Sequence, residues 1–240
     1  MTIPGLDRIY VINVRAFEQR RLHVSAELAR YGLEAEFVHE WDARDLTPEI
    51  EAQWFVPSAG LNASQKSCAL KHVAALRRIA ERDESAALVL EDDVVLAPAF
   101  AEGVANALAE APRYASPQVL FIGCGGNFYT PRSQRRPGQH LYPATRGRFA
   151  DSYLIGADAA RRRLDWIAAN RIARPIDNQF ELIDRTLGIS MLWYEDPVVE
   201  QGSKNGLFQT SLEPAPPRPV QRLKFGWEKF RRKILYQLWR

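Results

Sequence analysis

Short apolar segments alternate along this chain with segments whose apolar residues recur every three to four positions. The short segments are rich in β-branched and aromatic residues, as buried strands are. This alternation predicts an open α/β sheet with helices on both faces. Strands are expected at 8–14, 36–41, 87–90, 119–124, 149–155 and 189–194, helices at 16–31, 64–82, 98–111, 157–169 and 177–187, and irregular chain at 43–63 and 125–147.

The expected strand at 87–90 ends on three consecutive carboxylates, Glu91, Asp92 and Asp93. Buried carboxylates are costly unless something offsets their charge, and hard divalent cations prefer such oxygen ligands. In open α/β sheets, ligands bind beyond the carboxyl ends of the strands, which is where this triplet falls. The triplet therefore indicates a metal site, often one that holds a metal-bound diphosphate. A solvated acidic turn is the alternative.

The overall composition is that of an ordinary globular protein, with 46% apolar and 25% charged residues. No run approaches the roughly 18 apolar residues that span a bilayer, and residues 1–7 do not resemble a secretion signal. The two cysteines, Cys68 and Cys124, form neither a disulfide framework nor a zinc motif. Buried thiols in a reducing compartment are expected, which favours the cytoplasm.

Charge divides the chain into two expected parts, a domain at 1–212 and a tail at 213–240 that begins with a proline-rich linker. Residues 218–240 carry eight basic residues and one acidic, whereas the remaining 24 basic and 28 acidic residues make the body mildly negative. Apolar residues recur at helical spacing in this tail, which predicts a basic amphipathic helix suited to an anionic membrane surface. Packing of the helix onto the body is the alternative, and no nucleic-acid-reading motif accompanies the charge.

Phosphate-binding glycine loops are missing, since there is neither a Gly-Lys-Ser/Thr loop nor a Gly-x-Gly-x-x-Gly after the first strand. The glycine-rich segment 123–127 lacks the lysine and the following helix, so it is read as a close backbone approach to a sugar or as a simple turn. The loop after it holds Arg132, Arg135 and Arg136, which could close over a diphosphate or lie in solvent.

Six blocks, in order, resemble glycosyltransferase family 25, the lipopolysaccharide-type sugar transferases. They are the strand 9–14 with the arginine-containing helix start at 19–21, the Ser-Cys-Ala-Leu-Lys-His segment at 67–72, the Leu-Val-Leu-Glu-Asp-Asp segment at 88–93, Ser-Tyr-Leu-Ile at 152–155 with Gly-Ala, Pro-Ile-Asp at 175–177, and Glu-Gln at 200–201 with Ser211. Each block alone is weak, but six in family order across 8–211 are fairly specific. Ser67 and Lys71 depart from the family's glycine and serine, and Ala43 from its glycine.

The resemblance implies a GT-A-like open mixed sheet in which an acidic motif holds Mn²⁺ or Mg²⁺ under the diphosphate of a UDP-sugar. Carried onto this chain, Asp93 is the expected metal ligand with Asp92 in support. Glu91 is expected at the ribose or a backbone N–H, and Asn13 near the nucleobase. Lys71 is one turn from the expected sugar-nucleotide site and could contact phosphate or carboxylate. His72 is read either as a structural histidine on an apolar helix face or as a ligand.

An inverting reaction, which the resemblance implies, needs a carboxylate to deprotonate the acceptor hydroxyl. Asp177 is the first candidate, with helix N-capping as its alternative role, and Asp151 and Glu195 are the reserves.

The expected function is therefore transfer of a sugar, galactose from UDP-galactose by the resemblance, to a sugar hydroxyl of a bacterial lipopolysaccharide or lipooligosaccharide core. The acceptor would be a lipid-linked oligosaccharide, met by a cytoplasmic protein docked on the inner face of the cytoplasmic membrane through 218–240. A metal-dependent nucleotidyltransferase or diphosphate hydrolase is one rival. A degenerate, non-catalytic sugar-nucleotide-binding protein is another, kept open by the departures at Ser67 and Lys71.

Overall fold

The computed structural model describes residues 2–202 and, beyond them, residues 227 and 231. The linker and most of the basic tail predicted at 213–240 therefore lie outside the described residues. Within the described part of the chain, no helix is both long and apolar enough to cross a membrane.

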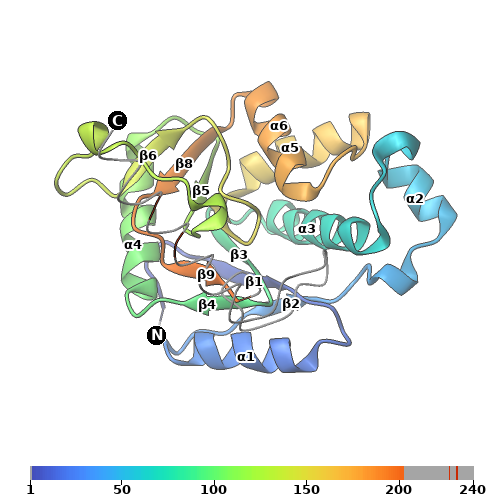
Figure 1. The fold of residues 1–240 in the computed structure, drawn as a ribbon, viewed down its shortest axis with the longest axis horizontal. Coiled ribbons are helices and arrows are strands. Elements are labelled where there is room, and N and C mark those ends of the chain that lie inside the picture. The colour runs from blue at the N-terminus through green and yellow to red at the C-terminus, as the bar shows by residue number, and fades with distance from the viewer. Residues whose placement is uncertain (1, 203–226, 228–230, 232–240) are drawn as a thin grey trace.

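The centre of the protein is a mixed seven-stranded sheet, in the order β2-β1-β3-β7-β5-β8-β6 (Figure 1). β1 runs parallel to β2 and β3, and β5 runs parallel to β8, whereas β7 and β6 are antiparallel to their neighbours. The strands are β1 (Arg8–Ile12), β2 (Glu36–Val38), β3 (Ala87–Glu91), β5 (Gln118–Phe121), β6 (Leu141–Ala144), β7 (Ser152–Ile155) and β8 (Ser190–Tyr194).

Helices cover both faces of this sheet, as the alternation of segments predicts (Figure 1). α3, α5 and α6 lie over one face, and α1 and α4 lie over the other. A short helix, α2, lies beyond the end of α3. The bounds are α1 (Glu18–Ala29), α2 (Pro48–Trp54), α3 (Ala63–Glu81), α4 (Phe100–Glu110), α5 (Ala157–Asn170) and α6 (Ile176–Leu187).

Strand β1 is buried on both faces from Ile9 to Ile12, and each of these four residues is apolar or aromatic. Tyr10 and Ile12 belong to the core under α3, whereas Ile9 and Val11 belong to the core under α1 and α4. Successive strand residues point to opposite faces, so a strand covered on both sides must be apolar at every position. The predicted open mixed sheet with helices on both faces is confirmed.

Two segments differ from the sequence-based expectation. The stretch 43–63, expected to be irregular, contains α2, whose first turn is capped by the Thr47 side chain accepting the N–H of Ile50. The loop 125–147 contains the edge strand β6, where Pro143 interrupts the apolar pattern. Edge strands tolerate proline and short length because only one side pairs, so periodicity alone does not reveal them.

A second, two-stranded sheet follows the acidic triplet directly. β4 (Val94–Leu96) pairs antiparallel with β9 (Val199–Gln201), and both strands are too short for periodicity to predict. Glu91 is thus the last residue of β3, Asp92 and Asp93 form the turn into β4, and the pairing brings residues near 200 back to the triplet. The backbone N–H of Gly202 donates to the Asp93 carbonyl at 2.6 Å.

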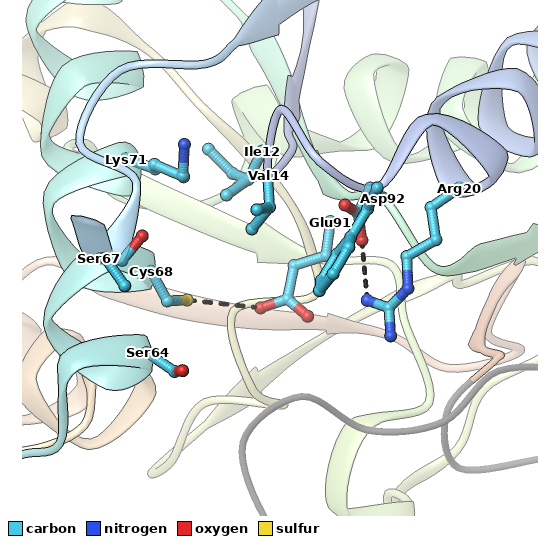
Figure 2. Close-up of a pocket in the computed structure, with 11 residues that line it drawn as sticks. Ile12, Val14, Arg20, Ser64, Ser67, Cys68, Lys71, Glu91 and Asp92 are labelled. Atoms are coloured by element: carbon cyan, nitrogen blue, oxygen red, sulfur yellow. Dashed lines mark hydrogen bonds and ion pairs between the residues drawn. The ribbon is translucent and has the colours of Figure 1, made fainter. Parts of the chain in front are cut away.

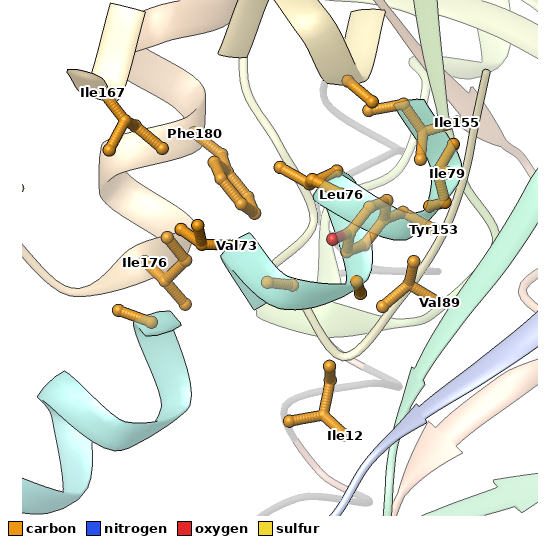
Figure 3. Close-up of a cluster of buried hydrophobic side chains, with 14 of the residues drawn as sticks. Ile12, Val73, Leu76, Ile79, Val89, Tyr153, Ile155, Ile167, Ile176 and Phe180 are labelled. Carbon is orange, nitrogen blue, oxygen red and sulfur yellow. The ribbon is translucent and has the colours of Figure 1, made fainter. Parts of the chain in front are cut away.

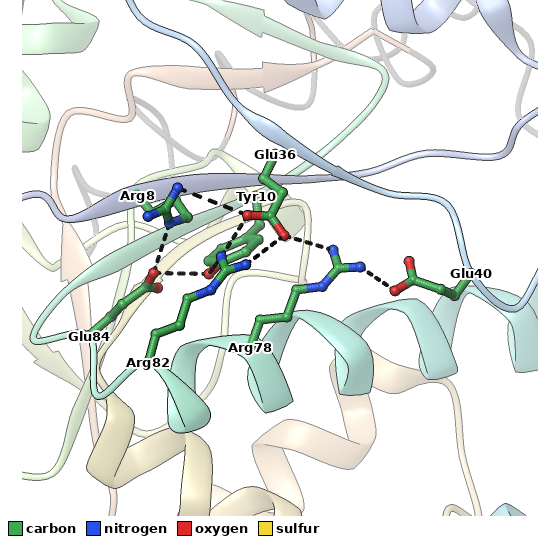
Figure 4. Close-up of polar contacts among 7 residues, drawn as sticks. All are labelled: Arg8, Tyr10, Glu36, Glu40, Arg78, Arg82 and Glu84. Carbon is green, nitrogen blue, oxygen red and sulfur yellow. Dashed lines mark hydrogen bonds and ion pairs between the residues drawn. The ribbon is translucent and has the colours of Figure 1, made fainter.

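A polar network ties the C-terminal end of α3 to the start of β1 (Figure 4). Arg82 donates to the Tyr10 hydroxyl at 2.8 Å and to Glu36 at 2.6 Å, and Tyr10 donates to Glu84 at 3.0 Å. Burial, with the Glu84 carboxylate, raises the pKa of Tyr10 to about 12. The hydroxyl is therefore neutral and can donate. The network fixes α3 along β1, and α3 provides one wall of the pocket described below.

A buried ion pair joins α5 and α6, the two helices that share a core with α3. Arg163 donates to both oxygens of Asp184, at 2.8 and 2.6 Å, and both side chains are at most 1% exposed. The Arg163 guanidinium also lies 4.1 Å from the centre of the Phe180 ring and 5.5 Å from that of Tyr153. Figure 3 shows these two rings within the apolar cluster around α3.

We expect Asp184→Ala to lower the free energy of unfolding by about 3–5 kcal/mol, because it leaves the Arg163 charge buried without its partner. Replacing both, as Arg163→Met with Asp184→Leu, should recover most of that loss, since no uncompensated charge remains. Urea unfolding followed by circular dichroism measures both. An Asp184→Ala protein as stable as wild type would show that the ion pair does not hold α5 and α6 together.

Candidate active site

A pocket of about 240 Å³ opens at the carboxyl ends of β1 and β3, against the first half of α3 (Figure 2). It is the position at which open α/β sheets bind ligands. The lining residues come from the end of β1 and the chain after it, from the first turn of α1, from a short 3-10 helix after β2, from α3, and from the acidic triplet. They are Ile12, Val14, Phe17, Arg20, Ala43, Ser64, Ser67, Cys68, Lys71, Glu91 and Asp92.

Asp92 is held by a cation and an amide. Its two carboxylate oxygens accept hydrogen bonds from Arg20 at 3.0 Å and from the Asn13 side chain at 2.8 Å. Burial raises the pKa of Asp92, and Arg20 and Asn13 oppose that rise only in part. Asn13, expected near the nucleobase, is thus a buried partner of the triplet, and its neighbours Ile12 and Val14 line the pocket.

Glu91 reaches into the pocket toward α3, as Figure 2 shows. One of its oxygens lies 3.9 Å from the Cys68 sulfur and 3.9 Å from His72 Nε2, and the other accepts a hydrogen bond from Gln201 at 3.1 Å. Burial would raise the pKa of Glu91, but His72 and Gln201 outweigh burial and lower it. Glu91 is therefore a carboxylate. The same surroundings raise the pKa of the Cys68 thiol, through burial and then the charge of Glu91.

His72 is fully buried beneath the pocket. Its Nδ1 is 3.1 Å from the Tyr153 hydroxyl, its ring stacks on Tyr153, and it meets Phe180 edge-on. Within the described residues, its Nε2 has no hydrogen-bond partner. His72 packs as a core residue and directs a nitrogen toward Glu91, and its role as a ligand stays a prediction.

The ammonium group of Lys71 forms an ion pair with a carboxylate and does not stand unpaired in the pocket. Its Nζ lies 2.8 Å from Asp42 and donates to the Glu40 carbonyl at 2.8 Å. Asp42 also accepts from Arg15 at 2.8 Å. Burial would raise the pKa of Asp42, but the hydrogen bonds from Arg15 and Lys71 lower it. Lys71 still lines the pocket, so contact with a phosphate stays a prediction.

Asp93 and Asp151 lie deeper than the sequence suggests. Both are at least 95% buried, and neither is among the described residues that line the pocket. Asp151 accepts from Ser152 at 3.0 Å, and burial, with the charge of Glu91, raises its pKa well above the ordinary value. Gly123 makes room here, since a Cβ at this position would lie 2.7 Å from Asp151. The metal role of Asp93 and the catalytic role of Asp151 stay predictions.

Asp177 lies in the first turn of α6 and is half-buried. Its carboxylate accepts the N–H of Asn178 at 2.9 Å, whereas the N-cap position belongs to Pro175, so Asp177 is not the N-cap. Burial raises its pKa, the Asn178 N–H opposes the rise, and the charge of Glu91 adds to it. Its charge also raises the pKa of Cys68. Asp177 therefore belongs to the same electrostatic cluster as Glu91 and Cys68.

The third carboxylate considered as a base, Glu195, anchors the loop 125–147. It accepts the N–H of Thr130 at 3.0 Å and forms an ion pair with Arg135. Gly125 packs against the Arg148 carbonyl, where a Cβ would come within 2.5 Å. The segment 123–127 is thus a close-packed turn, and its approach to a donor sugar stays a prediction. Closure of the loop over a diphosphate stays a prediction.

Three contributors to the site had no role assigned from the sequence. Cys68 and Gln201 stand in the family-like blocks at 67–72 and 200–201, and the third is Asp42. Cys68 and His72 stand four residues apart on α3, a spacing that places two side chains on one helix face and could have paired them. Gln201 and Asp42 carry no such signal, because their contacts with Glu91 and Lys71 join residues far apart in the chain.

We expect Asp42→Asn to lower the free energy of unfolding at pH 7 by about 3 kcal/mol, since Lys71 loses a buried counter-charge. The pKa of Asp42 is lowered in the folded protein, so its contribution exists above the ordinary value of about 4 and is lost as the pH falls through the folded pKa. Urea unfolding should show a constant difference from wild type between about pH 7 and 5, shrinking below about pH 4.

Glu51→Gln is the matched control, because the Glu51–Lys66 pair is partly exposed and should contribute less than about 1 kcal/mol. A deficit of Asp42→Asn that grows as the pH falls would contradict the assignment.

Comparison with known proteins adds to this geometry. Residues 6–123 match the model of "Glycosyltransferase family 25 (LPS biosynthesis protein)". No curated protein matches the sequence. Among solved structures, the catalytic domain of Drosophila beta1,4-galactosyltransferase 7 in complex with xylobiose is similar over 90% of this chain and 78% of that chain, with 12% identity and a TM-score of 0.42.

The matched segment contains every residue that lines the pocket, from the end of β1 to the acidic triplet. The segment 6–123 therefore carries the likeness to glycosyltransferase family 25, and this likeness supports a glycosyltransferase.

Proposed function

We propose that this glycosyltransferase moves a sugar from a UDP-sugar, with galactose the first candidate, to a sugar hydroxyl of a lipopolysaccharide or lipooligosaccharide core. The observation that carries the proposal is the pocket at the carboxyl ends of β1 and β3, lined by Glu91, Asp92 and Arg20. Its position, its charges and the family match support a sugar nucleotide as the ligand.

The residues of the pocket suit the two halves of such a donor. Ile12, Val14 and Phe17 supply apolar surface for a base and ribose, and Glu91 supplies an acceptor for ribose hydroxyls. Arg20 brings a positive charge to the pocket wall, where a diphosphate gains from charge-assisted hydrogen bonds. The pocket therefore combines an apolar wall with polar groups near a single edge.

A divalent ion, Mn²⁺ or Mg²⁺, would when bound neutralise the charge of the departing diphosphate. The triplet fits such an ion only in part. Asp92 lines the pocket, but Arg20 and Asn13 already bond its two oxygens, and Asp93 is not among the described lining residues. The Asp92–Asp93 pair does not present two carboxylates to the pocket in this conformation. No step of the sugar transfer is therefore assigned to an ion held there.

We assign the general base to Asp177. As the acceptor oxygen attacks the anomeric carbon, its proton passes to the carboxylate, the bond to the diphosphate oxygen breaks, and UDP leaves with inversion. The raised pKa of Asp177 favours this role, because a base works best when its pKa approaches the working pH. The neighbouring charge of Glu91 supports that rise.

A donor screen tests the function. Purified full-length protein is incubated with UDP- and GDP-sugars, a lipooligosaccharide-core acceptor, and Mn²⁺, Mg²⁺ or chelator, and nucleotide release is measured. We expect release of UDP from one UDP-sugar only when the acceptor is present. Release without acceptor would favour a diphosphate hydrolase or nucleotidyltransferase. Binding of a sugar nucleotide by calorimetry without any turnover would favour the non-catalytic rival, and failure of every sugar nucleotide to bind, with or without metal, would contradict the proposal.

Within the same assay, Asp177→Asn should lower kcat by roughly 10²–10⁴-fold, the usual contribution of a general base, with little change in donor binding. Asn178→Ala is the matched control, since its side chain is exposed beside Asp177. Asp93→Asn separately tests the predicted metal role through loss of metal-dependent donor binding. An Asp177→Asn enzyme with wild-type kcat would exclude this residue as the base.

We also propose, from sequence alone, that the basic segment 218–240 docks a cytoplasmic protein onto the anionic inner face of the cytoplasmic membrane, near a lipid-linked acceptor. Each basic residue near such a surface contributes about 1 kcal/mol. Deletion of 218–240 should abolish co-sedimentation with vesicles containing anionic lipid while leaving turnover of a soluble acceptor intact. Equal sedimentation of both proteins would point instead to a tail that does not bind membrane.

A further inference from the structure

We propose that Cys68, His72 and Glu91 bind a transition-metal ion of the zinc type, with one coordination position open to the pocket. This site differs from the Mn²⁺ or Mg²⁺ site expected on Asp92 and Asp93. It does not depend on the identity of the sugar donor, because the ion binds to side chains whether or not a nucleotide is present.

The three ligand atoms converge on one point. The Cys68 sulfur, a His72 nitrogen and a Glu91 oxygen all lie within 4.8 Å of one another. Glu91 Oε1 is 3.9 Å from each of the other two. Ligand atoms of a tetrahedral zinc ion stand about 3.3–3.8 Å apart, given zinc–ligand distances of about 2.0–2.3 Å. Small side-chain rotations would therefore close the set around an ion.

His72 provides the independent sign of a missing ligand. Its side chain is fully buried, and its Nε2 has no hydrogen-bond partner within the described residues. Buried polar atoms are almost always satisfied, so an orphaned imidazole nitrogen needs an explanation. Nδ1 lies 3.1 Å from the Tyr153 hydroxyl, and Nε2 faces the Glu91 carboxylate at 3.9 Å, so loss of the Nε2 proton would direct its lone pair at an ion in the cluster. This is the arrangement in which an outer group orients a metal-binding histidine.

The backbone and the neighbouring side chains hold the other ligands in place. Cys68 and His72 are four residues apart on α3, so both project from the same face of a rigid helix. Glu91 ends the buried strand β3, and its second oxygen accepts from Gln201 at 3.1 Å. Two ligands on one helix and a third on a fixed strand end form a site that needs little ordering when it binds.

The donor set selects the class of ion. A thiolate and an imidazole suit Zn²⁺ and similar transition metals, whereas Mg²⁺ and Mn²⁺ prefer oxygen ligands. The thiol gives up its proton when its sulfur binds the ion. Three protein ligands and one open position are typical of catalytic rather than structural zinc sites. Cys68 and Glu91 both line the pocket, which places the open position on the side where a donor would lie.

Cobalt provides a direct test, because Co²⁺ replaces Zn²⁺ and a cysteine ligand gives a sulfur-to-cobalt absorption band. Full-length protein, freed of metal by chelator, is titrated with Co²⁺ and then with Zn²⁺. We expect one Co²⁺ per chain, a thiolate band, and its displacement by one Zn²⁺. Cys68→Ser should remove the band, and His72→Gln should weaken binding at least about 10–100-fold, as for losses in zinc sites.

Cys124→Ser is the matched control, since Cys124 is the other cysteine of the chain, is buried, and does not belong to the cluster of three ligands. It should keep the full band. Circular dichroism of each variant shows whether it folds. If His72→Gln does not fold, the wild-type titration and Cys68→Ser still test the proposal. Absence of a thiolate band in wild type, or its survival in Cys68→Ser, would overturn the proposal. Neither readout involves turnover, so failure here leaves the proposed transferase function unaffected.

Discussion

The burial of the acidic triplet at the end of β3 is the constraint on which the rest of this structure depends. Three adjacent carboxylates at a strand end repel one another, and each is costly to remove from water. The fold offsets them separately. Arg20 and Asn13 bond Asp92, while Gln201 bonds Glu91 across the small second sheet. These contacts bring the ends of β1 and β9 and the start of α1 to the end of β3. The pocket lies at this place.

Helix α3 connects the offset charges to the apolar core. One of its ends is fixed by the Arg82–Tyr10 network, and its buried face packs under α5 and α6, where Arg163 and Asp184 pair. Its first half lines the pocket with Cys68 and Lys71 and directs His72 toward Glu91. A single rigid element thus sets the distance between the pocket wall and the carboxylates, which is what precise binding of a ligand requires.

Most of the sheet and its helices were predictable because their apolar periods are long enough to read. β4, β6 and β9 were not, since β4 follows the acidic triplet directly, Pro143 interrupts β6, and the apolar pattern around β9 is too short to assign. At the site, Glu91 and His72 were identified from local sequence and from the family resemblance. Cys68 was read only as a buried thiol, because its partner Glu91 is 23 residues away and a contact of that kind is set by packing.

The sequence by itself determined the alternation of strands and helices, the strand that ends on three carboxylates, and the family model that residues 6–123 match. These are properties of short segments, where residue type and spacing decide the outcome. Only the tertiary structure decided how the carboxylates divide their roles: Asp92 is bound to Arg20, Asp93 is buried, and Glu91 faces Cys68 and His72. That division depends on which distant side chains the packing of α1, α3 and β9 brings to the end of β3, and no local pattern contains it.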